Sequence, residues 1–191
     1  DIIGYEEDLR DRGYAPSSID RRISALKGLY RFCVREGYST KNPTESVKLP
    51  KPAEKLPDVL SIAKMNALLD GLPHDTPTDL RNRAILEVLY GCGLRVSECT
   101  GLDLSSCLLD QGILRIKGKG GKERVSPISG SAANALADYL EIGRPQLVKS
   151  YAKPTSAVFL NARGGRLTRQ SVHTLVANAG VSVGVKNLHP H

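Results

Sequence analysis

The chain has 191 residues, of which 40% are hydrophobic and 25% charged, and its formal net charge is +7. This composition is typical of a globular protein, and no apolar run approaches the ~18 residues that a membrane-spanning helix needs. The acidic first residues are unlike a secretory signal peptide, and the four cysteines form no C-x-x-C pair, which argues against a zinc site.

The positive charge is concentrated in the second part of the chain. Residues 1–80 hold 12 Lys/Arg against 13 Asp/Glu, a net charge of −1, whereas residues 81–191 hold 15 against 7, a net charge of +8. Such an asymmetry favours a polyanionic partner over the alternative that the charge serves solubility alone.

The first 47 residues predict two helices. Residues 2–12 form the first, residues 13–16 read as a turn, and Ser17 or Ser18 is the expected N-cap of a second helix that runs to about Glu36. Five apolar side chains at helical spacing are expected to form its buried face. They are Ile19, Ile23, Leu26, Tyr30 and Cys33.

A polar stripe runs along the same predicted helix. It could follow a DNA backbone, although a charged stripe is also what the solvated face of a helix looks like. The stripe consists of Ser24, Lys27, Arg31 and Arg35.

A linker is expected after this helical unit. Residues 49–57 contain three prolines in nine positions, which oppose helix formation and favour extended backbone. We therefore predict a helical domain at residues 1–47, a Pro/Lys linker at 48–57 and a second domain at 58–191.

The second domain mixes helices with a few short strands. Its core is expected to include Ile62 beside Met65, Leu68 and Leu69 in its first helix. The predicted elements are a helix opened by Ser61, a helix at 80–90 capped by Thr78 or Asp79, β-runs at 113–117 and 124–126, a helix from Ser129 to about Ile142, a strand at 157–160, a basic turn at 161–166, and a helix from Arg169 to about Ala179 capped by Thr168.

The stretch of residues 81–124 carries the two cations of greatest chemical interest. An apolar helix pattern is broken at Gly91 and Gly93, and Arg95 follows at the start of the next helix. Lys119 stands at the predicted tip of a hairpin. Glycines flank both cations, which would let a phosphate backbone come close.

Three motifs resemble the tyrosine recombinase, or phage integrase, family, and most closely its Xer type. They are residues 93–98, the hairpin Lys119 between Gly118 and Gly120, and the segment His189, Pro190 and His191. The resemblance implies a mainly α fold with a small β-sheet, in which a helical SAM-like core-binding domain precedes an α+β catalytic domain. It also implies cleavage and rejoining of DNA through a 3′-phosphotyrosine intermediate, as in chromosome dimer resolution.

The resemblance also assigns catalytic roles. Arg95 would stabilise charge on the scissile phosphate, because a guanidinium can hold two phosphate oxygens at once. Glu98 would orient that site, Lys119 would protonate the leaving 5′ oxygen, and His191 would assist proton transfer. The alternatives are an Arg95–Glu98 pair that is merely structural, a basic hairpin that touches phosphate only electrostatically, and an exposed His191.

Further basic and polar residues are candidates for contact with the DNA backbone. Double-stranded DNA is the expected partner, recombinase protomers would form a homo- or hetero-tetramer on paired sites, and the expected location is the cytoplasm, at the nucleoid. No metal or other cofactor is expected. The candidates are Lys27, Arg31, Arg35, Lys122, Arg124, Arg163, Arg166, Thr168 and Arg169.

The sequence departs from the family pattern after His191. The arginine of the family's His-x-x-Arg box is absent, and no tyrosine follows Tyr151, so we expect these 191 residues alone to be inactive. Tyr30, Tyr90 and Tyr139 fall on apolar helix faces and are expected in the core. A phage or transposon integrase, or a non-catalytic DNA-binding protein with the same fold, are the alternative functions.

Overall fold

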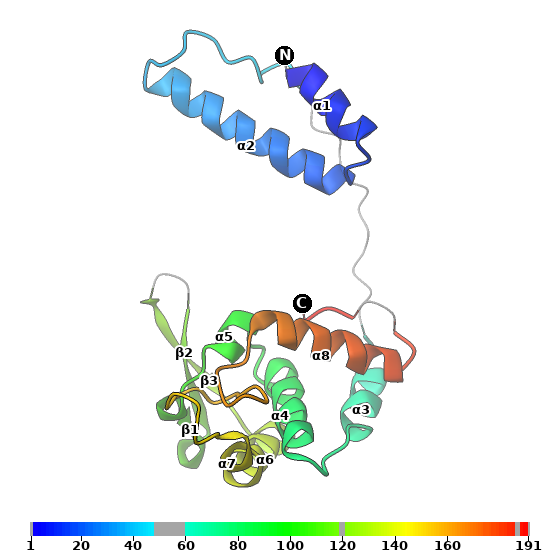
Figure 1. Ribbon diagram of the computed structural model, residues 1–191, viewed down its shortest axis with the longest axis vertical. Coiled ribbons are helices and arrows are strands. Elements are labelled where there is room, and N and C mark those ends of the chain that lie inside the picture. The colour runs from blue at the N-terminus through cyan, green and yellow to red at the C-terminus, as the bar shows by residue number, and fades with distance from the viewer. Residues whose placement is uncertain (1, 48–59, 119–120, 186–187, 191) are drawn as a thin grey trace. The chain divides into compact units, whose positions relative to one another are not determined.

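The computed structural model describes residues 2–47, 60–118, 121–185 and 188–190. The chain divides into two compact units, Asp1–Asp58 and Val59–His191 (Figure 1), and each has its own hydrophobic core. The linker predicted at residues 48–57 lies outside the described residues. In the described part of the chain, no helix is long and apolar enough to cross a membrane.

The first unit consists of α1 (Ile2–Asp11) and α2 (Pro16–Arg35), as the sequence predicted. The predicted N-cap was wrong, because Ala15 holds that position and Pro16 begins the helix. Proline is favoured there since its fixed φ suits the first turn and its missing N–H has no helical partner. The small core of this unit contains Leu9, Ile19, Ile23 and Val47, with Leu26 partly buried against it.

The second unit begins with α3 (Ile62–Asp70) and α4 (Pro77–Gly91). Ser61 caps α3 as predicted, but Ile62 is 72% exposed and was wrongly placed in the core. Helix α4 starts earlier than predicted, because Thr76 is its N-cap. Asp79 completes a capping box with Thr76, so each satisfies a backbone N–H of the other.

Helix α4 is the centre of the second unit. It contacts α3, α5 (Val96–Thr100), α6 (Gly130–Asp138), α7 (Arg144–Leu147) and α8 (Arg169–Ser182), and Figure 1 shows these helices around it. Ala84, Ile85 and Val88 are completely buried. Burial of a side chain such as Ile85 contributes about 1.5–3 kcal/mol. Tyr90, near the end of α4, is 47% exposed and is not the core residue predicted.

A three-stranded antiparallel sheet packs beside these helices. It contains β1 (Cys107–Leu108), β2 (Ile113–Lys117) and β3 (Glu123–Pro127), in the order β1-β2-β3. β2 and β3 form the predicted hairpin, whereas β1 was not predicted because it has two residues and no alternating pattern. The register places Arg124 opposite the buried Ile116.

The second half of this unit follows the prediction with two changes. The helix after Ser129 continues beyond Ile142, because a π-helical turn (Tyr139–Gly143) joins α6 to α7. The apolar run 157–160 is fully buried but forms isolated bridges instead of a strand. Its backbone bonds partly to other backbone, as Val158 N–H does to Leu102 O, and partly to the Tyr139 hydroxyl, which donates to Val158 O and accepts from the N–H of Leu160.

Helix α8 begins at Arg169 as predicted and ends at Ser182, three residues later than expected. Its N-cap is Thr168, whose hydroxyl accepts a hydrogen bond from the N–H of Ser171. The mainly helical architecture with one small sheet confirms the predicted fold class.

Candidate functional site

The turn between α4 and α5 turns Arg95 outward. Gly93 has a φ of 59°, a left-handed conformation that glycine adopts most readily. Arg95 is the N-cap of α5 and has extended backbone, with buried Leu94 and Val96 on either side. Successive side chains of extended backbone point in opposite directions, so the burial of both neighbours leaves the Arg95 side chain 72% exposed.

Glu98 is the buried carboxylate that holds this arginine. Its side chain is 4% exposed, and it accepts hydrogen bonds from the Arg95 N–H at 2.9 Å and from Arg95 Nη1 at 3.0 Å. Arg124 Nη2 donates a third, at 2.9 Å. Burial alone would raise the pKa of Glu98, but the hydrogen bonds from Arg124 and Arg95 outweigh it and lower that pKa to about 2. Glu98 is therefore ionised at neutral pH.

The arrangement suits the binding of a phosphate. Within the described residues, Nε and Nη2 of Arg95 make no hydrogen bond, while Nη1 is fixed on Glu98. A guanidinium held along one edge by a buried carboxylate keeps its remaining N–H groups available for bidentate contact with phosphate oxygens. The predicted pairing of Arg95 with Glu98 is present, and it leaves the guanidinium accessible.

Strand β3 also contacts this turn. Arg124 and Ser126 lie on the face of the hairpin that carries the buried Leu114 and Ile116. The hydroxyl of Ser126 donates to Cys92 O at 3.1 Å, and Arg124 pairs with Glu98. Arg124 was expected to contact DNA, and the ion pair that its guanidinium makes with Glu98 was not foreseen.

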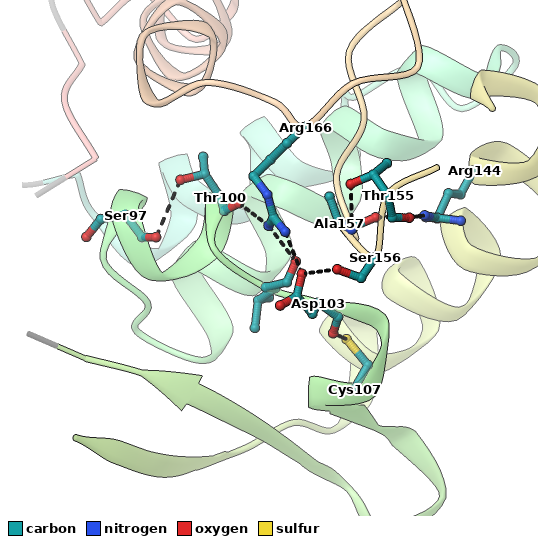
Figure 2. A network of polar contacts seen from close by, with 10 residues as sticks. Ser97, Thr100, Asp103, Cys107, Arg144, Thr155, Ser156, Ala157 and Arg166 are labelled. Carbon is teal, nitrogen blue, oxygen red and sulfur yellow. Dashed lines mark hydrogen bonds and ion pairs between the residues drawn. The ribbon is translucent and has the colours of Figure 1, made fainter. Parts of the chain in front are cut away.

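Arg166 lies at the other end of α5, and its guanidinium makes several contacts with the protein itself (Figure 2), although its side chain is 38% exposed. Its Nη1 donates to Thr100 O at 2.9 Å and to Leu102 O at 3.0 Å, and its Nη2 pairs with Asp103. Asp103 also accepts a hydrogen bond from Ser156. The hydrogen bonds from Arg166 and then Ser156 lower the pKa of Asp103. Arg166 was expected to contact DNA, and the capping of the end of α5 by its guanidinium was not foreseen.

The other candidates of this region are exposed. Arg163 lies in the turn at 161–166, and Arg169 is the first residue of α8. Thr168 is exposed, but its hydroxyl caps α8 and also bonds to the Ser171 hydroxyl at 2.9 Å. Arg163 and Arg169 therefore have side chains that a phosphate could reach, whereas Thr168 has a structural role as well.

In the first unit, two of the three basic candidates are engaged. Lys27 Nζ donates to Val47 O, and Arg35 pairs with Glu36 and lies over the Phe32 ring. Arg31 is exposed. The Lys27 contact joins α2 to the segment that follows it, so Lys27 is the least available of the three for DNA.

Two of the three predicted catalytic residues, Lys119 and His191, lie outside the described residues. Lys122, beside the first of them, is exposed, and its carbonyl closes the hairpin by accepting from the Gly118 N–H at 2.7 Å. In the described residues, the structure therefore brings together Arg95, Glu98 and Arg124. No group of three or more His, Cys, Asp or Glu side chains among those residues could hold a metal ion.

Two family matches divide the chain much as its two compact units do. Residues 58–191 match the phage integrase family, and residues 1–37 match the N-terminal SAM-like domain of phage integrases.

Curated relatives are similar over most or all of the chain. Tyrosine recombinase XerC of Roseiflexus castenholzii is 39% identical over 192 residues, which cover 100% of this chain and 61% of the relative. Tyrosine recombinase XerD of Mycobacterium tuberculosis is 41% identical over 179 residues, covering 91% of this chain and 57% of the relative. The chain thus spans about three fifths of the length of the relatives it matches.

Solved structures share the fold. The recombinase XerH bound to a palindromic difH substrate, in a post-cleavage complex, superposes with a TM-score of 0.77 at 22% identity and covers 100% of this chain and 58% of that chain. A lambda integrase dimer bound to a core site superposes with a TM-score of 0.70 at 17% identity, covering 98% and 66%.

Proposed function

The chain belongs to the phage integrase family of tyrosine recombinases, and from this we propose that the whole protein is a site-specific recombinase that cuts and rejoins double-stranded DNA. The observation that carries the proposal is the exposed Arg95 guanidinium, anchored on the buried carboxylate of Glu98 at a glycine turn. A guanidinium that is exposed and already oriented by a buried carboxylate suits a phosphate better than a freely rotating surface arginine does.

The reaction consists of two successive transesterifications, one that cleaves the DNA strand and one that rejoins it. A tyrosine oxygen attacks the scissile phosphorus, the 5′ oxygen leaves and takes up a proton, and the DNA 3′ end becomes linked to the tyrosine. Attack by a 5′ hydroxyl of another strand then releases the tyrosine and restores a phosphodiester. The bond energy is conserved in the phosphotyrosine, so this chemistry requires no nucleotide cofactor and no metal.

We assign charge stabilisation to Arg95. The non-bridging oxygens gain negative charge as the nucleophile attacks, and an arginine already held in place loses little freedom in meeting them. The family resemblance adds Lys119 as the acid that protonates the 5′ oxygen and His191 as a residue that assists proton transfer. We propose Arg31, Lys122, Arg163 and Arg169 as backbone contacts, because within the described residues their side chains are exposed and make no hydrogen bond.

The similarity to XerC and XerD proteins favours a role in resolving chromosome dimers, in which protomers assemble as a tetramer on paired sites. Identities of 39–41% to proteins of this type support the role over that of a phage or transposon integrase. A recombinase acting on the chromosome would work in the cytoplasm, at the nucleoid.

A suicide-substrate assay on the whole protein tests the proposal. A nick beside the cleavage position lets the short 5′ fragment diffuse away, so that a covalent protein–DNA adduct accumulates and can be seen on a denaturing gel. We expect an adduct with wild-type protein and its near loss with Arg95→Ala. DNA binding without any adduct would favour the non-catalytic alternative. The 191-residue chain alone should give no adduct. In the family the nucleophilic tyrosine follows the His-x-x-Arg box, and the last of the seven tyrosines in this sequence is Tyr151.

A further inference from the structure

Strand β3 braces the arginine site from both sides. Ser126 bonds to Cys92 O, three residues before Arg95, and Arg124 bonds to Glu98, three residues after it. The turn that carries Arg95 is thus tied to the sheet at each end. Both bonds come from the hairpin face that also carries the buried Ile116.

The register explains why these two polar residues meet the site. Side chains alternate along a strand, so Arg124 and Ser126 share one face of β3 and Val125 lies on the other. Val125 is 59% exposed, whereas Ser126 is buried. Arg124 shares the face of Ser126 but its side chain remains 41% exposed, so its guanidinium reaches Glu98 from the edge of the buried region.

The Glu98 carboxylate is buried and depends on its charged donors, whereas the Arg124 side chain is 41% exposed. Glu98 Oε1 receives the Arg95 guanidinium, while Oε2 receives Arg124 Nη2 and the backbone N–H of Arg95. Each oxygen therefore has a charged donor, and the carboxylate cannot turn to follow one arginine without losing the other. Charge-assisted bonds of this kind fix geometry better than neutral ones.

We propose that Arg124 is a positioning residue for Arg95: it locks the Glu98 carboxylate so that the Arg95 guanidinium meets the scissile phosphate in one orientation. The proposal rests on the recombinase function proposed above. It gives Arg124 a role different from a contact with the DNA backbone, which is what a basic hairpin residue would otherwise suggest.

Arg124→Gln separates these two roles in the whole protein. A positioning role predicts a cleavage rate at saturating DNA that falls about 10- to 100-fold, since a small misplacement of a catalytic group costs that much. The DNA affinity and its salt dependence should not change. A backbone contact instead predicts weaker binding and a salt slope that is smaller by about one.

The same substitution on an Arg95→Lys background gives a second reading. If Arg124 acts through Arg95, Arg124→Gln should lower the cleavage rate little once Arg95 has been replaced. The fold-losses of the two single variants should therefore not multiply in the double variant. Effects that multiply fully would overturn the proposal.

Arg115→Gln is the matched control, because Arg115 is exposed on β2 and faces away from the site, opposite Val125. Its cleavage rate should stay at the wild-type value.

Two further measurements keep the test decisive. If Arg124→Gln lowers the melting temperature so far that cleavage cannot be read, Arg124→Lys retains the charge and should fall between wild type and Arg124→Gln in rate. Relaxation of the Arg95 Nε–H group, followed by NMR in protein labelled with ¹⁵N-arginine, does not depend on catalysis. We expect it to become more mobile in Arg124→Gln. Unchanged mobility would overturn the positioning role even if the wild type proved to form no adduct.

Discussion

The two ends of α5 each hold an arginine beside a carboxylate, yet they are used differently. At the start, Arg95 bonds to Glu98 through one nitrogen and stays 72% exposed. At the end, Arg166 donates to two backbone carbonyls and pairs with Asp103. Both are basic residues in glycine-rich sequence, so their neighbours in the chain do not distinguish them. They differ in how many of their guanidinium N–H groups donate hydrogen bonds within the protein.

The difference between the two arginines comes from the backbone groups near each of them. A helix end leaves carbonyl oxygens without partners, and Arg166 donates to that of Thr100, the last residue of α5, and to that of Leu102 just after it. A helix start leaves N–H groups without partners, which an arginine cannot satisfy because it has no acceptor. Glu98 takes the backbone N–H of Arg95 instead. The Arg95 guanidinium is therefore left with donors for a ligand.

The largest expected effect is that of Arg95→Ala. It should lower the rate of adduct formation about 10²–10³-fold or more, because it removes charge stabilisation in the transition state. Unfolding free energy should also fall, by about 1–2 kcal/mol, because the buried Glu98 carboxylate loses one of its charged donors. Single-turnover cleavage at saturating DNA measures the rate. A loss of less than tenfold would place Arg95 among ordinary backbone contacts.

Glu98→Gln should affect both activity and stability. Cleavage should fall about 10–100-fold as Arg95 loses its anchor, and unfolding free energy should fall by about 1–3 kcal/mol at neutral pH as charged hydrogen bonds are lost.

The stability effect of Glu98→Gln should depend on pH. Folding lowers the pKa of Glu98 to about 2, so its contribution is present above the unfolded value of about 4.3 and is lost as pH falls from there through the folded pKa. Urea unfolding of both proteins at several pH values should show the difference shrinking toward pH 2. A difference that stays constant with pH would contradict this account of Glu98.

Arg166→Ala should affect stability more than DNA binding, unlike Arg95→Ala, whose main effect is on the cleavage rate. We expect a loss of about 1–2 kcal/mol in unfolding free energy, because Thr100 O, Leu102 O and Asp103 each lose a hydrogen bond from the guanidinium, and little change in the salt dependence of DNA binding. Arg163→Ala is the matched control, because Arg163 lies in the same turn and its guanidinium makes no hydrogen bond within the described residues; it should leave stability unchanged. A smaller salt slope with full stability in Arg166→Ala would reinstate Arg166 as a DNA contact.

The smallest effect is expected for Arg169→Ala. Arg169 is exposed at the start of α8, so unfolding free energy should change by less than ~0.5 kcal/mol. If Arg169 contacts a phosphate, DNA affinity should fall for all sequences alike and the salt slope should drop by about one. Titrations at several salt concentrations with specific and random duplexes check both points.

The sequence predicted much of the architecture because its local signals are strong. The apolar pattern of α4, the glycines after it and the alternating hairpin strands all lie where expected. The start of α4 was missed because Thr76 and Asp79 form a capping box. Asp79 was taken as a possible N-cap, whereas it is the third helical residue and Thr76 is the N-cap. The buried run at 157–160 was taken for a strand because its partners, such as the Tyr139 hydroxyl, are distant in sequence.

The site was predicted in its central pair but not in its surroundings. Arg95 and Glu98 are three residues apart on one turn, so their contact follows from helical spacing. Arg124 lies 26 positions from Glu98, and its contact depends on hairpin register, which the residues alone left open. The carbonyls that Arg166 caps lie 64 and 66 positions away in sequence. Lys119 and His191 lie outside the described residues, and their roles remain predictions.

The most direct test of the central claim compares two substrates with the whole protein. A methylphosphonate at the cleavage position replaces a charged non-bridging oxygen by a methyl group, so less charge needs to be stabilised there. If Arg95 acts by stabilising that charge, Arg95→Ala should lose about 10²-fold or more on the phosphodiester and less than about tenfold on the methylphosphonate. An equal loss on both substrates would mean that Arg95 shapes the site without neutralising the phosphate, and would contradict the account.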